Sequence, residues 1–322
     1  MPVKNPGADH VYISPFQPGD ERLIPDLVKS VYGDAYDPRF RDPAAILEMV
    51  HGGLFLMVAR EGDRALGISG FFAGDAPNAR LFHSGRRMVL PEARKGGIAS
   101  ACEAWGQERF FSAQLGDALY ANVPAPGPSW GLLRKNGYVL SALEPALPNR
   151  PARLLAFRLF AQEKRTVWLP VDYGPEIAMI TASLHPSWVC QPAFGSCPAG
   201  AVTEGTVRDE EELLRLSVTR AGADFAACLD RWEQKGKPVE VFLSLDVEWH
   251  NEAVAELRRR GYYFCGLAPL WNGPRSDALI MTKTAGAPDL AGVDFPEELG
   301  RYLIFMIRRD SARARAVCGA IQ

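Results

Sequence analysis

The sequence predicts a mixed α/β (α+β) protein in which a central sheet is flanked by helices. Short apolar runs of strand length alternate with segments of helical spacing through the first half of the chain. A turn with two adjacent glycines joins one of these strands to a helix, and a segment of the second half repeats part of the first. At 322 residues the chain has room for two ordinary domains. We therefore expect a complete α/β domain followed by a shortened second one.

The first half alternates strands and helices in a definite order. Residues 20–32 carry apolar residues at helical spacing, and Pro43 opens a second helix that Asp42 precedes as N-cap. The other predicted elements are strands at 11–16, 54–59, 65–72, 80–90, 119–123, 139–143 and 154–160, and helices at 43–50, 99–114 and 128–135. The predicted order is therefore β-α-α-β-β-β-α-β-α-β-β.

One strand-to-helix turn has the features of an anion site. Pro91 ends the strand, Gly96 and Gly97 follow, and a helix with a small first turn begins directly afterwards. The first N–H groups of a helix have no partner within it, and the helix dipole is positive there. Because glycine lets a ligand approach the backbone, such a turn suits phosphate or pyrophosphate, and Arg94 and Lys95 add positive charge. Neither GxxxxGKS/T nor GxGxxG is present, which excludes these two nucleotide motifs.

The glycine turn also matches a known family pattern. Its order, Val89-x-Pro91-x-x-Arg94-x-x-Gly97-x-Ala99, resembles the acyl-CoA-binding loop of the GCN5-related N-acetyltransferases (the GNAT superfamily), whose usual form is R/Q-x-x-G-x-G/A after a strand. The predicted element order is also that of the superfamily, so the resemblance extends over residues 11–160. It implies a GNAT fold, with a GNAT acyl-CoA-binding domain at residues 1–160. The alternative interpretation of the motif is an ordinary glycine turn.

The resemblance implies which residues would hold acyl-CoA. Backbone N–H groups from Lys95 to Ser100 would hold the pyrophosphate, and the preceding strand would pair with the pantetheine arm as an added strand would. Asn122 matches a family position that often contacts the CoA arm. The residues expected to bind acyl-CoA are therefore Met88, Val89, Leu90, Arg94, Lys95, Gly96, Gly97, Ile98, Ala99, Ser100 and Asn122. An amine would attack the thioester directly, and the protein would position the amine and keep it neutral.

The sequence departs from the superfamily at its catalytic positions. Many members carry a tyrosine as general acid where this chain has Leu133, and a glutamate base on the fourth strand, where residues 81–90 contain none. We expect His83 to act as the base, because an imidazole can accept a proton near neutral pH. Tyr120, on the opposite strand, is expected to donate a proton. The alternative interpretation makes His83 a packed or surface residue and Tyr120 a core aromatic.

The second half repeats part of the first. Residues 119–138 and 243–262 align without gaps, with identities at Leu119/Leu243, Val123/Val247, Leu133/Leu257, Arg134/Arg258, Gly137/Gly261 and Tyr138/Tyr262. After a connector at 161–200, we interpret residues 201–285 as a degenerate, shortened GNAT-like domain. Its expected elements are a strand at 202–207, helices around 210–235, and strands at 264–267 and 278–282.

This second domain lacks the R-x-x-G-x-G/A motif. Its nearest candidate, residues 220–223, does not have the required spacing. We therefore expect a structural partner that has lost the phosphate site, the alternative being a second acyl-CoA site.

The last segment, residues 286–322, is expected to form a helical tail with a helix at 295–319. Its basic residues are Arg301, Arg308, Arg309, Arg313 and Arg315. We interpret them as a solvated face or as positive charge near a helix C-terminus, where it is favoured. A contact with nucleic acid or with a CoA phosphate is the alternative.

Composition and charge argue against several classes of protein. The chain is 47% hydrophobic and 23% charged, as is typical of soluble globular proteins, and its net charge of −2 provides no field that would recruit nucleic acid or an anionic membrane. The six cysteines show no CxxC spacing, so we expect reduced thiols and no metal site. No apolar run approaches the length of about 20 residues that spans a membrane, and the first ten residues lack the apolar core of a signal peptide. A cytoplasmic protein without membrane or nucleic-acid partners is expected.

Together these features predict a CoA-dependent acyltransferase, most simply a GNAT-type N-acetyltransferase. It would move an acetyl or other acyl group from acyl-CoA to an amine of a small molecule or peptide, with acetyl-CoA as cosubstrate and no metal. The alternative is a non-catalytic acyl-CoA-binding sensor or scaffold protein, which the missing tyrosine and glutamate and the degenerate second domain favour. Both a monomer and a homodimer are compatible with the sequence.

Overall fold

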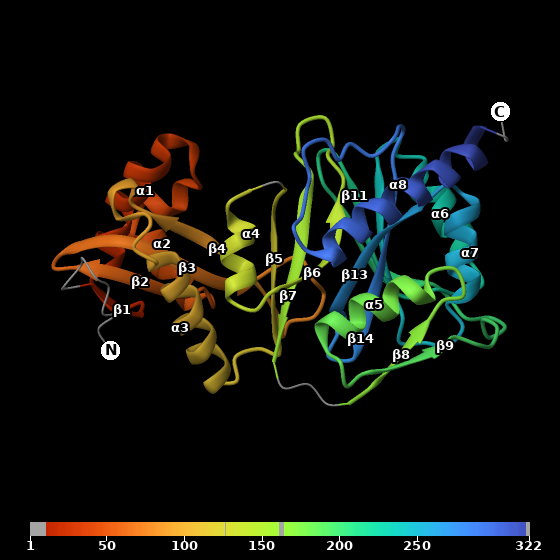
Figure 1. Ribbon diagram of the computed structural model, residues 1–322, viewed down its shortest axis with the longest axis horizontal. Coiled ribbons are helices and arrows are strands. Elements are labelled where there is room, and N and C mark those ends of the chain that lie inside the picture. The colour runs from red at the N-terminus through yellow and green to blue at the C-terminus, as the bar shows by residue number, and fades with distance from the viewer. Residues whose placement is uncertain (1–10, 126, 161–163, 320–322) are drawn as a thin grey trace.

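The computed structural model describes residues 11–125, 127–160 and 164–319, and it places twelve strands in one continuous mixed sheet (Figure 1). The order across the sheet is β1-β2-β3-β4-β5-β7-β6-β13-β14-β12-β11-β10, and β8 and β9 form a separate parallel pair. The strands are β1 Tyr12–Pro15, β2 Phe55–Glu61, β3 Arg64–Ala73, β4 Leu81–Val89, β5 Ala118–Pro124, β6 Val139–Glu144, β7 Arg153–Leu159, β8 Thr166–Leu169, β9 Val189–Pro192, β10 Glu204–Asp209, β11 Leu214–Arg220, β12 Val239–Ser244, β13 Tyr263–Gly273 and β14 Ser276–Lys283. The helices are α1 Ile24–Tyr32, α2 Pro43–His51, α3 Ile98–Ser112, α4 Ser129–Lys135, α5 Gly174–Leu184, α6 Phe225–Glu233, α7 Asn251–Arg259 and α8 Glu298–Gly319. The predicted mixed sheet flanked by helices is confirmed.

The first unit, from β1 to β7, has the predicted order of elements. Its local signals also act as expected: Pro43 stands in the first turn of α2, and the Asp42 side chain accepts a hydrogen bond of 2.9 Å from the Ala44 N–H. Strands β1 to β4 pair antiparallel, β5 runs parallel to β4, and β7 lies between β5 and β6. Helix α3 packs against β2 and β3, and α1 packs against β3 and β4.

Strands β4 and β5 diverge soon after they begin to pair. Only residues 81–83 of β4 pair with β5, at residues 118–120, so the rest of β4 has an open edge on that side. Along its other edge β4 has a bulge: Ile68 pairs with Met88 and Gly70 with Gly85, which leaves one extra residue on β4. Arg86 lies in this bulge with a φ of 53°. The split and the bulge together fix the edge that faces the functional site.

The second unit repeats the strand arrangement of the first. Strand β12 runs parallel to β11, and β14 lies between β12 and β13, just as β7 lies between β5 and β6. The helices predicted around 210–235 are wrong for part of this range, because residues 214–220 form β11. Leu214, Leu216 and Val218 alternate along that strand and are buried, and both of its edges are paired. This alternation is the two-residue period of a strand, which the predicted helices did not take into account.

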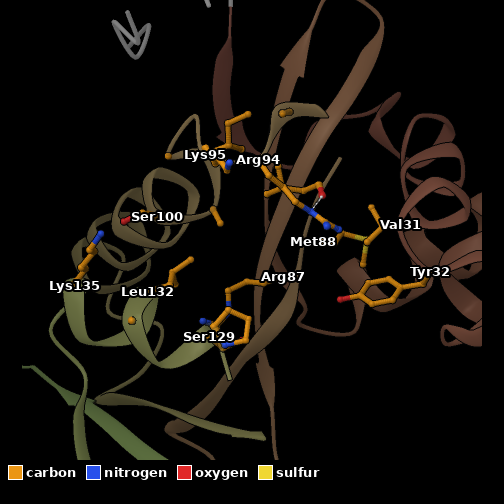
Figure 2. Close-up of a pocket in the computed structure, with 17 residues that line it drawn as sticks. Val31, Tyr32, Arg87, Met88, Arg94, Lys95, Ser100, Ser129, Leu132 and Lys135 are labelled. Atoms are coloured by element: carbon orange, nitrogen blue, oxygen red, sulfur yellow. Dashed lines mark hydrogen bonds between the residues drawn. The ribbon is translucent and has the colours of Figure 1, made fainter. Parts of the chain in front are cut away.

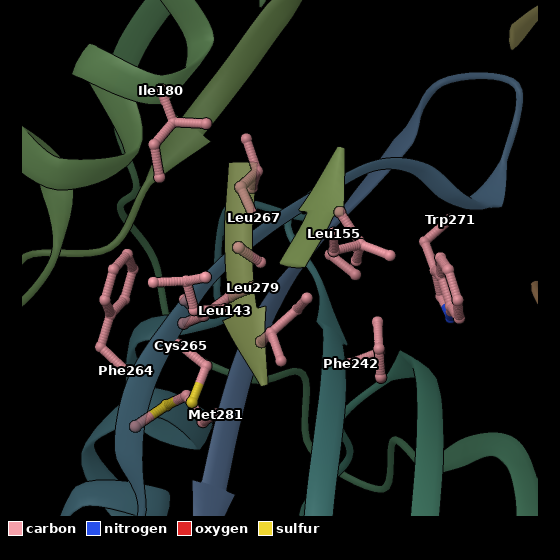
Figure 3. Packing of buried hydrophobic residues seen from close by; sticks show 14 of the residues in the cluster. Leu143, Leu155, Ile180, Phe242, Phe264, Cys265, Leu267, Trp271, Leu279 and Met281 are labelled. Atoms are coloured by element: carbon pink, nitrogen blue, oxygen red, sulfur yellow. The ribbon is translucent and has the colours of Figure 1, made fainter. Parts of the chain in front are cut away.

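One hydrophobic cluster spans both units, and a second cluster lies wholly within the first unit. Strands β6 and β13 join at Ala142 and Gly266, where a Cβ on Gly266 would overlap the backbone of β6. Figure 3 shows Leu143 and Leu155 of the first unit among Leu267, Leu279 and Met281 of the second. Helices α5 and α8 pack across β6 and β13, which covers the junction. Among the described residues, no helix combines the length and the apolar character needed to cross a membrane.

Candidate anion-binding pocket

A pocket of about 590 Å³ opens beside the free edge of β4. It is bounded by the end of α1, the end of β4, the loop to α3, the first turn of α3, and α4. The lining residues are Val31, Tyr32, Arg87, Met88, Val89, Ala93, Arg94, Lys95, Gly97, Ile98, Ala99, Ser100, Pro128, Ser129, Gly131, Leu132 and Lys135. Figure 2 shows Val31 and Tyr32 on one side of the pocket, and Ser100, Leu132 and Lys135 on the other.

Most of the residues expected to bind acyl-CoA line this pocket. They are Met88, Val89, Arg94, Lys95, Gly97, Ile98, Ala99 and Ser100. Three others do not line it: Leu90 is a core residue, Gly96 lies in the loop between two lining residues, and Asn122 is on β5. The Asn122 amide donates to Glu144 at 3.0 Å and accepts from Arg153 at 2.6 Å. The binding roles of all these residues stay predictions.

The loop before α3 leaves backbone donors open to the pocket. Gly97 is the N-cap of this 15-residue helix with a φ of 74°, and no side chain caps the helix there. A Cβ on Gly97 would have no atom within 4 Å, so the space above the glycine is empty. Lys95 also has a positive φ, of 73°, which is uncommon for a residue with a side chain. An uncapped helix start beside open space suits an anion.

The charge of the lining is of one sign. Arg87, Arg94, Lys95 and Lys135 line the pocket, and no aspartate or glutamate does. The Arg94 Nε donates a hydrogen bond of 3.3 Å to the Val89 carbonyl oxygen, which places that guanidinium along the free edge of β4. A cationic lining without carboxylates favours a ligand with several negative charges.

Arg87 is the most enclosed of these cations, with a side chain 12% exposed. Its Nη2 donates to the Ser84 carbonyl oxygen at 3.2 Å, while its Nη1 is buried and has no hydrogen-bond partner among the described residues. A buried donor without a partner costs free energy, so this nitrogen suits a site that a ligand completes. The pocket therefore fits an anionic ligand.

Sequence reasoning missed two walls of the pocket. Val31 and Tyr32 stand at the end of α1, where helical spacing indicated only a core position for Val31. On the opposite wall, Leu132 and Lys135 of α4 line the pocket, whereas Leu133, at the family's tyrosine position, is fully buried in the core. The only available signal was the expected helix itself, since the side of a helix that faces a ligand depends on tertiary packing.

His83 and Tyr120 lie where β4 and β5 still pair, outside the pocket lining. Their rings stack at 4.7 Å, and the Asn122 N–H donates to His83 Nε2 at 3.4 Å. Burial lowers the pKa of His83 to about 4, so its imidazole is neutral at pH 7. Burial also raises the pKa of Tyr120, whose hydroxyl accepts a hydrogen bond of 2.8 Å from the Asp75 N–H. Their catalytic roles stay predictions.

The corresponding position of the second unit holds a smaller pocket of about 160 Å³ between the loop that follows β11, α6 and α7. Its loop amides are already bonded: the Gly222 N–H donates to Thr203 Oγ1 at 3.0 Å, and the Ala223 N–H donates to the Ala201 carbonyl oxygen at 2.8 Å. Its lining includes two carboxylates, Glu252 and Glu256, and no lysine or arginine. This arrangement is unfavourable for an anion.

The described residues hold five free cysteines, Cys102, Cys190, Cys197, Cys228 and Cys265. No group of three or more histidine, cysteine, aspartate or glutamate side chains in that part of the chain is placed to hold a metal ion. The expectations of a cytoplasmic setting and of metal-independent chemistry stay predictions.

No protein-family model matches this chain, and no curated protein matches it. Several solved structures are similar to it. The ribosomal-protein-S5-alanine acetyltransferase from Vibrio fischeri is 15% identical with a TM-score of 0.40, and the match covers 47% of this chain and 93% of that one. An aminoglycoside 6'-N-acetyltransferase complexed with coenzyme A is 14% identical with a TM-score of 0.39, covering 47% and 98% of the two chains. An acetyltransferase of the GNAT family from Streptococcus pneumoniae is 12% identical with a TM-score of 0.40, covering 47% and 100%. Slightly less than half of this chain thus corresponds to almost the whole of each of these acetyltransferases.

Proposed function

We propose that this protein binds acyl-CoA in the pocket beside β4 and transfers the acyl group to an amine. The observation that carries the proposal is the lining: four cationic side chains, no carboxylate, and the uncapped start of α3 at Gly97. Coenzyme A carries a pyrophosphate and a further phosphate, so it matches a pocket with these charges.

Each wall of the pocket has a task in this proposal. The backbone N–H groups of the first turn of α3 would hold the pyrophosphate, while Arg94, Lys95 and Lys135 would balance the phosphate charges. The free edge of β4 at Met88 and Val89 would pair with the amides of the pantetheine arm, as an added strand does. In the present structure Arg94 Nε occupies the Val89 carbonyl oxygen, so this side chain would have to release that oxygen when the arm binds.

Acyl transfer would then proceed by direct attack. The nitrogen of a neutral amine forms a bond to the thioester carbonyl carbon, the carbon–sulfur bond breaks, and the amine proton ends on the departing thiol. Positioning of the two reactants supplies much of the rate, and a base helps by removing the proton. His83 enters the proposal as base and Tyr120 as acid. His83 is neutral at pH 7, as a base must be, but its pKa of about 4 makes it a weak one.

A second candidate function is acyl-CoA binding without catalysis. It is favoured by the positions of His83 and Tyr120: both lie outside the pocket lining, and Tyr120 is buried in the core. A sensor or scaffold of this kind would bind CoA in the same pocket and release no thiol with any amine. Thiol release from acetyl-CoA over a panel of small amines and peptides separates the two functions.

The proposal is tested by calorimetric titration with acetyl-CoA and with free CoA. Gly97→Glu should weaken binding by about 100-fold or more, because a carboxylate enters the seat of the pyrophosphate. Gly62→Glu is a matched control: Gly62 also has a positive φ, of 56°, and open space at its Cβ, but it lies in the turn between β2 and β3, away from the pocket. Near-wild-type affinity in a folded Gly97→Glu variant, or no binding to the wild type, would overturn the site.

A further inference from the structure

Arg87 is not explained by binding of the phosphates. It precedes Val89 by two residues, so it lies about 6–7 Å further along β4, on the side away from the loop that leads to α3. That direction leads toward the split between β4 and β5, where the proposed thioester would lie. The lining also includes the apolar side chains of Met88, Leu132 and Pro128 and the polar side chain of Ser129. A cation at this end of the pocket therefore needs another explanation.

The nearest carboxylate does not neutralise Arg87 well. Arg87 Nε is 3.8 Å from Glu103 Oε2, which is longer than a hydrogen bond. The Glu103 carboxylate already accepts hydrogen bonds from Ser69 and Ser84, each at 2.8 Å, and from Tyr138 at 2.6 Å. Glu103 is fully buried, and these three hydroxyl donors satisfy it. Within the part of the chain that the structure describes, Arg87 Nη1 has no hydrogen-bond partner.

Other enclosed arginines of this protein are paired differently. Arg215 Nε is 2.7 Å from Glu240, and a second carboxylate, Glu144, lies 3.2 Å from the same guanidinium. Arg60 is 2.5 Å from Asp20. Each of these two arginines has a carboxylate in direct contact. Arg87 lines a pocket and has no such contact, as expected of a side chain whose carboxylate comes with a ligand.

We propose that Arg87 binds a carboxylate group of a substrate at the reactive end of the pocket. This inference rests on the proposed function, and it makes one of the two substrates acidic. The carboxylate belongs either to the acyl group of a dicarboxylic acyl-CoA or to the amine acceptor, which is then an amino acid. In both cases the guanidinium donates charge-assisted hydrogen bonds to the carboxylate and fixes its position relative to the thioester.

The experiment has one arm for each source. In the first, the wild-type protein is titrated with succinyl-CoA and with acetyl-CoA, which differ by one terminal carboxylate. In the second, the protein is saturated with CoA and titrated with glycine and with glycinamide. If Arg87 binds a carboxylate of the acyl group, succinyl-CoA should bind at least about tenfold more tightly than acetyl-CoA. If it binds a carboxylate of the acceptor, glycine should bind at least about tenfold more tightly than glycinamide. Equal binding within both pairs overturns the inference, and it does so without any variant.

Two variants assign the preference to Arg87. Arg87→Gln should abolish the preference for the carboxylate-bearing ligand while free CoA still binds. Arg86→Gln should leave that preference unchanged. Arg86 is the adjacent arginine, but its guanidinium lies over the rings of Phe40 and Phe72, and it does not line the pocket. A preference that survives in a folded Arg87→Gln variant would place the carboxylate elsewhere and overturn the inference. Failure of the wild type to bind free CoA would instead overturn the proposed function.

Discussion

The loops that open α3 and α6 occupy the same place in two similar units, yet only one of them is open to a ligand. Each loop follows a strand that runs parallel to the next strand of its unit. Before α3, Gly97 faces empty space and the rim is cationic. Before α6, the amides of Gly222 and Ala223 are bonded to residues 201–203. The comparison teaches that topology determines where an anion site can form, while the local chain decides whether its donors remain available.

The helices opposite these loops, α4 and α7, also contribute different side chains to the two pockets. Ser129 and Leu132 of α4 line the larger pocket, and the residues aligned with them in α7 are Ala253 and Glu256, which line the smaller one. Strand pairing differs as well, because β11 and β12 stay paired over five residues, 214–218 with 239–243, whereas β4 and β5 pair over three. The second unit thus differs from the first in the bonding of its loop, in the residues of its helix and in the pairing of its strands.

The largest expected effect is a loss of stability, which is compared between two variants: Gly222→Ala in the loop before α6 and Gly97→Ala in the loop before α3. A Cβ on Gly222 would overlap the backbone of residues 201–203, so Gly222→Ala should lower the free energy of unfolding by about 2–4 kcal/mol. A Cβ on Gly97 meets nothing, so Gly97→Ala should cost only the strain of a positive φ, about 1 kcal/mol. Urea unfolding followed by circular dichroism measures both values. Equal losses would show that the segment at 201–203 is not what fills the second loop.

One histidine in each unit, the half-buried His83 and the buried His250, should make the protein sensitive to acid. Burial lowers the pKa of both His83 and His250 from 6.5 to about 4. Between these values the unfolded chain binds more protons than the folded one, so stability is retained above pH 6.5 and is lost as the pH falls toward 4. From pH 7 to 4.5 each histidine should contribute a loss of about 2–3 kcal/mol in the free energy of unfolding.

Carboxylates also titrate in this pH range, so variants in which glutamine replaces one histidine are needed to isolate the contribution of that histidine to the loss of stability. His83→Gln and His250→Gln should each show a smaller loss between pH 7 and 4.5 than the wild type, whatever their stability at pH 7. Urea unfolding at both pH values gives the difference. An unchanged loss in either variant would mean that its histidine titrates alike in the folded and unfolded chains.

Local chemistry made part of this structure predictable. The order of elements in the first unit follows from apolar periodicity, and the start of α2 follows from Asp42 and Pro43. The loop before α3 was identified from its glycines and cations, and most of its residues line the pocket. These features depend on neighbours within a few positions in the sequence, so a single sequence contains them.

Features that depend on distant segments were not predictable in this way. Residues 214–220 were expected to be helical, and they form a strand whose two edges pair with β10 and β12. The two opposite walls of the pocket, with Tyr32 on one and Lys135 on the other, form only when α1 and α4 are brought to either side of β4. The burial of His83 is set by Phe72 and Tyr120, whose rings lie 4.9 and 4.7 Å away. A histidine at position 83 suggested a catalytic base, but the pKa of its imidazole depends on how the ring is packed.

The smallest expected effect is on the affinity for CoA, and it is tested by charge reversal at the last residues of α4 and α7. Lys135 and Arg259 are aligned, exposed cations that end these helices, but only Lys135 lines a pocket, while Arg259 contacts Glu256 at 2.6 Å. Lys135→Glu should weaken binding of free CoA about tenfold, since reversal of an exposed charge replaces an attraction of about 1 kcal/mol or less by a repulsion of similar size. Arg259→Glu changes the net charge equally and should leave the affinity unchanged.

Calorimetry in low salt and in 1 M salt completes the test, because an interaction between exposed charges is screened at high ionic strength. An equal loss in both variants would mean that CoA responds to the net charge of the protein rather than to a phosphate seat beside α4, and it would remove the electrostatic difference between the two units.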